Sequence, residues 1–476
     1  MRKTLTVAAV VGAALASRRL MQPRGNKHWS ERVRESEESY RHARTRILIL
    51  GAGFGGLTLA LQLGQKLRTS DNISVLVIDR NNDLLFTPLL WTVANGRVNP
   101  NNAVIPIRDF QRNKRFQVRH AEIEHINLDQ KEVRTSQGSL PYDLLVIALG
   151  SHTAVPDLPG LREHALPFHT PADALQLRNH LIDAVESAHY ATNSAERQAW
   201  LTFVIGGAGD TGTELAAIVH DYLLRGLFWA YPWLADASVR VVIVGRAERI
   251  LPMSDHRTSH EVHRALERER IEVLTGQSIT GVEETAVLTS AGTIPARTLF
   301  WAAGITAPDV VHQLPVPHAR NGAVLVDDHL RIPAYQEVYV IGDCAWAYDS
   351  TTNAPVPPTA QAARQQGRYV SRVIADGCMN QSSLPYLYMP LGHLALLGHD
   401  TGVARVGPVT LGGVPAWILW HLVYLLRNPS WTRRIRLVAD WLLSGFLGPE
   451  TGQLRLDTEP PRRMRVLQRE AETLSQ

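Results

Sequence analysis

The chain has 476 residues, a formal net charge of +4 and 45% apolar residues, which indicates a globular protein of two or three domains. Its two cysteines, Cys344 and Cys378, form no CxxC pair, so we expect two buried thiols and neither a disulfide framework nor a redox-active dithiol. Arginines concentrate in residues 1–46 and 427–436 without a nucleic-acid-binding motif. An anionic membrane surface is therefore an expected partner, and nucleic acid is not.

The N-terminal segment, residues 1–17, has a basic start and a short apolar run that ends in small residues, as in a signal peptide. The run is too short to span a bilayer easily, and two arginines follow it directly. Three interpretations stay open: a cleaved export signal, a weak anchor or targeting segment, or an over-extended start with Met21 as the true initiator. Residues 22–44 are polar and are predicted to be a disordered linker.

The first predicted unit opens with an apolar strand over 46–50, a glycine-rich turn over 51–56 and a helix over 54–67. Glycines at such a turn let the backbone approach a pyrophosphate, and the helix N-terminus stabilises its charge. A second strand, 73–78, ends in Asp79, which can accept hydrogen bonds from ribose hydroxyls. The alternative for this residue is an exposed strand-end acid.

The second predicted unit repeats the pattern about 150 residues later, with a strand over 201–205, glycines at 207, 209 and 212, and a helix through Glu214 to Leu224. One such fingerprint is weak support, because glycine-rich turns are common. Two of them, each between a strand and a helix, indicate a protein that holds two dinucleotides at once. A flavin enzyme that takes hydride from a nicotinamide fits this pair.

Later strands are predicted over 142–149, 239–245, 298–304 and 337–343, and a helix begins after Pro357. Because the chain returns to the first unit, we expect an α/β fold of two Rossmann-like domains, with the nicotinamide domain inserted in the flavin domain. The expected boundaries are 1–43 for the N-terminal targeting, anchor or disordered segment, 44–152 and 322–380 for the FAD domain, 153–321 for the NAD(P)H domain, 381–455 for a membrane-associating region and 456–476 for a disordered tail.

The membrane-associating region contains two apolar stretches, 415–427 and 431–447, that hold four of the eleven tryptophans and several arginines. Neither stretch reaches the roughly 20 apolar residues of a spanning helix. Trp-rich apolar faces flanked by Arg are typical of amphipathic helices that lie in the membrane interface. A buried helical hairpin or a dimer contact is the alternative.

These features together resemble the type II NADH dehydrogenases, the single-subunit NAD(P)H:quinone oxidoreductases, over roughly residues 44–450. The glycine loops are shared with a wider flavoprotein superfamily, so the resemblance rests mainly on five other segments. These are Phe86-Thr-Pro-Leu-Leu90, Val93-Ala-Asn-Gly96, Trp301-Ala-Ala-Gly304, Gly342-Asp343 and Ala360-Gln361-Ala-Ala-Arg-Gln365-Gln-Gly367. The resemblance implies FAD as cofactor, NADH or NADPH as substrate and a membrane quinone as acceptor, with no metal site.

The resemblance also implies roles for individual residues. FAD is expected to contact Gly51, Ala52, Gly53, Phe54, Gly55, Gly56, Asp79, Arg80, Ile123, Gly150, Gly342, Asp343, Ala360 and Gln361. The nicotinamide dinucleotide is expected at Gly207, Gly209, Gly212 and Gly304. Gln361 and Gln365, four apart on one helical face, are expected to line the quinone site. Glu214 is expected near the meeting point of nicotinamide, flavin and quinone, the alternative being a first-turn acid favoured by the helix dipole.

One departure from the family concerns the end of the strand at 239–245. Relatives that use NADH usually carry an acidic residue there, whereas this chain has Gly245 followed by Arg246. A missing carboxylate removes repulsion of a 2′-phosphate, and Arg246 could pair with one, so we expect NADPH acceptance. Glu248 could still reach the ribose.

The predicted function is hydride transfer from NAD(P)H to FAD and two-electron transfer to quinone without proton pumping, on the cytoplasmic face of the cell membrane, or on the mitochondrial inner membrane if the source is eukaryotic. A homodimer is implied by the resemblance alone. The alternatives are a soluble flavin reductase of an iron–sulfur carrier and a non-catalytic flavin and nucleotide sensor. A sulfide:quinone reductase is disfavoured because Cys344 and Cys378 do not form the paired cysteines that this chemistry needs.

Overall fold

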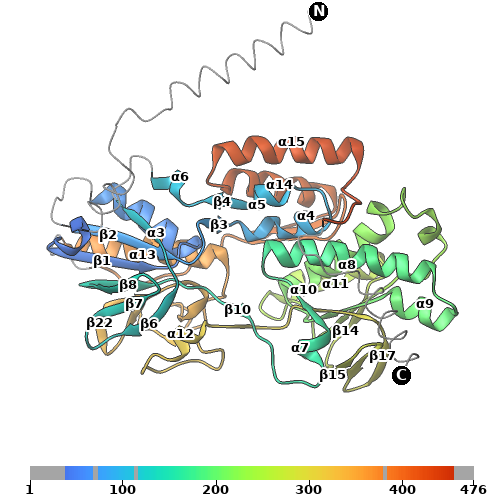
Figure 1. Ribbon diagram of the computed structural model, residues 1–476, viewed down its shortest axis with the longest axis horizontal. Helices are drawn as coiled ribbons and strands as arrows, with labels where there is room; N and C mark the ends of the chain where they lie inside the picture. Colours follow the sequence, from blue (N-terminus) through green and yellow to red (C-terminus); the bar gives the residue numbers. More distant parts are fainter. Residues whose placement is uncertain (1–37, 68–72, 112–115, 379–382, 455–476) are drawn as a thin grey trace, which may run out of the picture.

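Two α/β domains stand side by side in the structure, and two C-terminal helices lie along the upper edge of the view (Figure 1). The first domain is blue and orange in this view, because it uses chain from two separate parts of the sequence, and the second is mainly green. Predictions for residues 1–37 and 455–476 lie outside the described residues. This computed structural model describes residues 38–67, 73–111, 116–378 and 383–454.

The first domain is built on a six-stranded sheet in which only β21 is antiparallel. The central strand β1 is apolar throughout its buried part because alternate residues pack on opposite faces: Ile47 and Ile49 join one core cluster, Leu48 and Leu50 another. In sheet order the strands are β21 (Arg331–Ile332), β22 (Tyr335–Val340), β9 (Leu144–Ile147), β1 (Thr45–Leu50), β2 (Ile73–Asp79) and β5 (Gln117–His120).

Helices α3 (Phe54–Lys66) and α13 (Ala360–Cys378) pack closely together in the first domain. A Cβ on Gly367 would lie 2.5 Å from the carbonyl oxygen of Gly55, so a glycine is needed at 367 for this approach. The remaining elements of the domain are β3 (Asp83–Leu85), α4 (Leu90–Ala94), α5 (Pro100–Ala103), β4 (Val104–Pro106), α6 (Arg108–Gln111), the meander β6 (Ile123–Asn127), β7 (Glu132–Thr135) and β8 (Gly138–Pro141), α12 (Asp309–His312), β20 (Val324–Leu325) and β23 (Ala345–Trp346).

The second domain is inserted into the first. Strand β22 pairs in parallel with β9, although the whole second domain lies between them in the sequence. The chain leaves through β10 (His152–Thr153) and returns through β19 (Ile305–Thr306), and these two short strands pair with each other. The predicted fold class, two Rossmann-like domains with one inserted in the other, is confirmed.

The second domain repeats the layout of the first in a five-stranded parallel sheet. In sheet order its strands are β11 (Ala165–Pro167), β18 (Thr298–Trp301), β12 (Thr202–Gly206), β13 (Arg240–Val244) and β14 (Glu272–Leu274). The other elements are α7 (Leu161–His164), α8 (Pro171–His189), α9 (Ser194–Trp200), α10 (Asp210–Asp221), α11 (His256–Arg268) and the meander β15 (Ile279–Glu283), β16 (Ala286–Thr289) and β17 (Gly292–Pro295).

The C-terminal region begins with a sheet that the sequence analysis did not anticipate. It consists of β24 (His393–Leu396), β25 (Gly402–Val406) and β26 (Val409–Gly412) in antiparallel order. Helices α14 (Val414–Arg427) and α15 (Trp431–Leu447) follow, close to the two predicted stretches. Within the described residues, no helix is long and apolar enough to cross a membrane.

Two local features differ from the predictions. Helix α10 ends at Asp221 rather than Leu224 and continues as a π-helical turn, Tyr222–Gly226, in which Leu227 N–H donates to the Tyr222 carbonyl at 2.8 Å. Tyr40, which falls in the predicted disordered linker, is fully buried, and its hydroxyl donates to the Pro141 carbonyl at 2.8 Å. The packing of the first domain therefore starts before Arg44.

Candidate active site

The two glycine loops share one geometry at their first and third glycines. Gly51 and Gly207 have positive φ values, +95° and +124°, which a residue with a side chain rarely adopts. A Cβ on Gly56 would lie 1.9 Å from the Gly51 oxygen, and one on Gly212 would lie 1.8 Å from the Gly207 oxygen. These four glycines therefore shape the turns themselves.

The second glycine of each loop, Gly53 or Gly209, faces open space. A Cβ added to either would meet no protein atom within 4 Å. Each glycine is the N-cap of its helix, α3 or α10, and neither helix has a side chain capping its first N–H groups. Unpaired N–H groups at a helix N-terminus attract anions, so both loops fit a dinucleotide pyrophosphate.

Residues predicted to bind adenosine gather at one end of β2. Asp79 accepts hydrogen bonds from Ala52 N–H at 2.6 Å and Asn81 N–H at 2.7 Å, and its backbone carbonyl accepts from Ala121. Burial raises the pKa of Asp79 despite these bonds. Arg80 forms a long ion pair with Glu122 at 3.9 Å, immediately before Ile123 at the start of β6. Asp79 therefore holds the glycine loop as well as facing the predicted adenosine.

At the other end of the first loop, three distant segments meet. Ser151 Oγ, next to Gly150, donates to Asp343 at 2.8 Å, and burial raises the pKa of that carboxyl. Gly342 N–H donates to Gln366 Oε1 at 2.6 Å, and a small pocket opens beside these residues. A buried carboxylate beside an open pocket fits a ligand rich in hydroxyl groups, as the ribityl chain of FAD is. Sequence reasoning missed Gln366, because no sequence motif indicates that its side chain accepts a hydrogen bond from Gly342, 24 residues away.

Both glutamines predicted for the quinone site lie in the first turns of α13, which begins at Ala360. Both are hydrogen-bonded to the same segment, at residues 388–389. Gln361 Nε2 donates to the Tyr388 hydroxyl at 3.2 Å. Gln365 donates to the Met389 carbonyl at 2.7 Å and accepts from Met389 N–H at 3.0 Å. Gln365 therefore uses both ends of its amide to hold this segment, and its contact with quinone stays a prediction.

The segments that carried the family resemblance have clear structural roles. Phe86 packs edge-on against Phe54 of the glycine loop, with ring centroids 5.8 Å apart, and against Tyr424 of α14 at 6.3 Å. Gly96 has a positive φ, and a Cβ there would lie 2.6 Å from the carbonyl oxygen of Glu450. Both segments thus join the first domain to the C-terminal region.

Glu214 of α10 lies inside the protein, where the second domain meets the C-terminal sheet. Its Oε1 accepts a hydrogen bond from Leu396 N–H of β24 at 3.0 Å. Burial raises the pKa of this carboxyl to about 8, and the charge of Asp210 one helical turn away adds to the rise. A buried carboxyl whose pKa is raised toward neutral pH, unlike that of a solvated first-turn acid, is suited to hold and donate a proton.

The residue after β13 occupies the same position in the second domain as Asp79 does in the first. Gly51 N–H donates to the Ile78 carbonyl, and Gly207 N–H donates to Val244, so Gly245 is the counterpart of Asp79. A Cβ on Gly245 would lie 2.4 Å from Ala208 Cβ, so packing also restricts this position to glycine. Arg246 is exposed, and Glu248 lies beside Gly276. Gly304 has a positive φ of +83° and accepts from Ala154 N–H at 3.1 Å.

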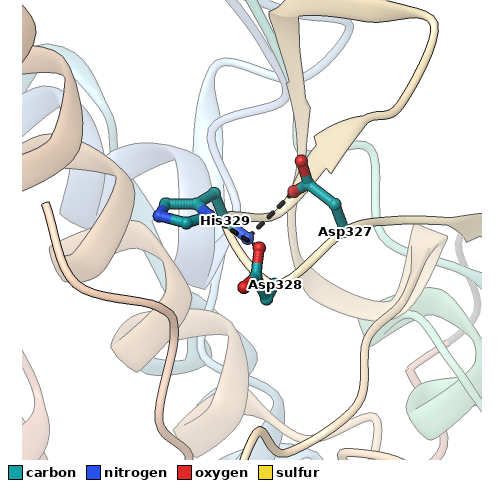
Figure 2. Close-up of side chains that lie close together, drawn as sticks. All are labelled: Asp327, Asp328 and His329. Carbon is teal, nitrogen blue, oxygen red and sulfur yellow. Dashed lines mark hydrogen bonds and ion pairs between the residues drawn. The ribbon is translucent and has the colours of Figure 1, made fainter.

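A separate cluster of ionisable groups lies away from the loops, at Asp327, Asp328 and His329 (Figure 2). Asp327 accepts hydrogen bonds from the N–H groups of His329 and Arg331, and His329 Nδ1 lies 2.6 Å from Asp328 Oδ1. His329 Nε2 lies 3.2 Å from the Ser383 carbonyl. These contacts are within the protein and indicate a structural turn. The predicted burial of Cys344 is confirmed, whereas the Cys378 side chain lies outside the description.

Comparison with known proteins agrees with this architecture. The pyridine nucleotide-disulphide oxidoreductase family model matches residues 45–367, and the NDH2 C-terminal domain model matches residues 391–449. The type II NADH:quinone oxidoreductase Ndh of Mycobacterium tuberculosis is 30% identical, over 87% of this chain and 90% of that protein. The chain belongs to the type II NADH:quinone oxidoreductase family. The predicted family and enzyme class are confirmed.

Two further matches extend this finding to a second curated relative and a solved structure. The demethylphylloquinone reductase NdbB of Synechocystis is 31% identical over 84% of this chain and 96% of that protein. The structure of NDH2 from Plasmodium falciparum in complex with NADH has a TM-score of 0.77 at 21% identity, covering 86% of this chain and all of that one, and shows the same fold. The roles of the individual site residues stay predictions.

Proposed function

We propose that this type II NADH:quinone oxidoreductase takes hydride from NAD(P)H and reduces a membrane quinone. The observation that carries the proposal is the pair of open glycine loops, at Gly53 and Gly209, with the buried carboxyl of Glu214 on the helix that follows the second loop. FAD, when bound, accepts the hydride and passes two electrons to the quinone. Overall, NAD(P)H, one proton and quinone give NAD(P)⁺ and quinol.

In this proposal the protein binds the two dinucleotides, orients the flavin and supplies a proton to the quinone. The N-termini of α3 and α10 hold one pyrophosphate each, and Asp343 and Gln366 form the wall around the flavin side chain. Glu214 supplies the proton that the quinone takes up, and its pKa of about 8 keeps the proton in place until then. Gln361 and Gln365 position the segment beside the acceptor site.

We also propose that the protein docks on a membrane surface through α14 and α15. Large apolar side chains on these helices are exposed, including Ile418, Leu422, Leu443 and Phe446, the last at 86%. Helix α15 also carries three arginines in its first two turns, at 433, 434 and 436, and arginine together with an apolar face favours an anionic membrane surface. The cytoplasmic face of the cell membrane and a homodimer remain predictions of the same proposal.

The nicotinamide specificity follows from β13. Because Gly245 cannot carry a carboxylate and Arg246 is exposed beside it, we expect NADPH to be accepted along with NADH. The deciding measurement is kcat/KM for each nucleotide. A value for NADH about tenfold or more above that for NADPH, equal to about 1.4 kcal/mol of discrimination, would contradict this expectation.

The test of the function is anaerobic stopped-flow spectroscopy of the purified protein, following bleaching of the flavin by NADH or NADPH and then its reoxidation by a short-chain quinone. Fast bleaching with fast reoxidation supports the proposal. Bleaching without reoxidation would favour a soluble reductase of an iron–sulfur carrier. If neither nucleotide bleaches the flavin, the result would favour the alternative function, a non-catalytic flavin and nucleotide sensor.

A further inference from the structure

Glu214 is enclosed and must be reprotonated after each turnover if it donates a proton. Its carboxyl is held by Leu396 N–H, and Tyr424 of α14 also lies close enough to interact with it electrostatically. No buried carboxyl exchanges protons quickly without a polar route to solvent. The residues around it should therefore contain such a route.

The best route starts at His393, three residues before Leu396 on β24. His393 Nε2 lies 2.5 Å from Asp210 Oδ1, and the Asp210 side chain is 57% exposed. Asp210 and Glu214 are four residues apart on α10, so both face β24 from the same side of the helix. The contact between His393 and Asp210 is thus one helical turn from the contact between Leu396 and Glu214.

The other ring nitrogen, His393 Nδ1, is buried and has no hydrogen-bond partner among the described residues. A buried, unpaired imidazole nitrogen is costly, and no protein group competes for the proton that it can bind or release. Burial alone lowers the pKa of His393, but the hydrogen bond and charge of Asp210, with weaker contributions from Glu214 and Asp255, raise it overall. Asp255 is itself paired with Arg405, the cross-strand neighbour of His393 on β25.

We propose that His393, held by Asp210, carries protons from solvent to Glu214 during quinone reduction. Glu214 loses its proton to one quinone oxygen. Bound flavin would supply the two electrons together with the hydrogen first received as hydride, which completes the second O–H bond of the quinol. The His393 imidazolium then transfers its proton to the Glu214 carboxylate through one bridging water and regains a proton from solvent. While Glu214 is ionised, the imidazolium stabilises the buried charge. The inference rests on the proposed function.

The test compares His393→Gln with His399→Gln, because His399 forms another histidine–aspartate pair, with Asp400 at 2.7 Å, just beyond the same strand. Removing the relay should slow flavin reoxidation by quinone about tenfold at pH 8, and less at pH 6 where solvent protons are abundant. Added imidazole should restore the rate in His393→Ala. His399→Gln should behave as the wild type.

A second readout does not depend on turnover. Infrared difference titration of the protonated carboxyl should show a higher Glu214 pKa in His393→Gln, because the cation that favours the ionised form is gone. An unchanged pH profile, no rescue by imidazole and an unchanged carboxyl titration would overturn the relay. If wild-type protein is bleached by NADH but not reoxidised by quinone, the proposed function fails instead.

Discussion

The glycines of the second loop divide into two kinds, although the sequence presents them alike. Gly212 is packed against the Gly207 carbonyl, whereas Gly209 faces open space. The same division separates Gly56 from Gly53 in the first loop. One kind is needed by the turn and the other by the ligand, so single substitutions should separate stability from binding.

The matched pair Gly209→Val and Gly212→Ala tests this division. Gly209→Val should leave the melting temperature unchanged and weaken NADH binding about tenfold or more, because its side chain occupies the pyrophosphate position. Gly212→Ala should lower the free energy of unfolding by about 1–3 kcal/mol, because its Cβ overlaps a backbone oxygen. Thermal unfolding and NADH titration measure both. Equal binding loss with no stability difference would contradict the assignment.

Glu214 makes stability depend on pH in a defined direction. Its folded pKa is about 8 and its ordinary value is 4.5, so between these values the unfolded chain binds fewer protons than the folded one. The free energy of unfolding should therefore fall as pH rises from about 5 to about 8, by a few kcal/mol at most. Glu214→Gln should flatten this fall, as measured by denaturant unfolding at several pH values. If the free energy of unfolding of the variant falls by the same amount, a group other than Glu214 causes the pH dependence.

At the scale of elements, α14 and α15 expose apolar side chains that an aqueous surface does not favour. If they dock on lipid, charges placed there should abolish docking. The double variant Leu443→Glu and Phe446→Glu should reduce flotation with anionic vesicles at least about tenfold, given about 0.8 kcal/mol per buried methylene. Trp229→Glu is the control, since Trp229 is equally exposed but lies on the second domain. Equal flotation of the double variant and wild type would exclude these helices as the docking face.

The elements also show what the sequence could and could not predict. Strands with long apolar runs, such as β1 and β12, and their glycine turns were predicted because their signal is local. The sheet β24–β26 was missed, because its strands have only four or five residues and their buried and exposed positions do not alternate. Gln366 and His393 were missed for another reason: their partners, Gly342 and Asp210, are distant in sequence, and only the fold brings them together.

At the scale of the whole molecule, one buried carboxylate joins the three regions. Asp221, 2% exposed, lies 3.6 Å from Arg97 of the first domain and 3.1 Å from Arg225 of the second, and accepts from His399 N–H of the C-terminal region. Each neighbour belongs to a different folding unit. We therefore expect Asp221 to help hold the three regions in their relative positions.

Asp221→Asn should lower the free energy of unfolding by about 2 kcal/mol, because it leaves the mostly buried Arg97 guanidinium without its counter-charge, whereas Arg225 is half exposed and keeps its ion pair with Glu269. It should also increase hydrogen exchange where the domains meet. Glu124→Gln is the control, since Glu124 pairs with Arg134 within the first domain and both side chains are about half exposed, so its loss should cost less than about 1 kcal/mol. Equal destabilisation by the two variants would argue against a special role of Asp221 in holding the three regions together.

The insertion of one domain into the other has a consequence for synthesis on the ribosome. When Ile147 emerges, β9 has only β1 beside it, and its other edge stays open until β22 is made after the entire second domain. An open apolar strand edge is a template for wrong pairing between nascent chains. The second domain, whose five strands are contiguous in the chain, can close first. We therefore expect the incomplete first sheet to be the stage of synthesis at which strands of neighbouring nascent chains can mispair.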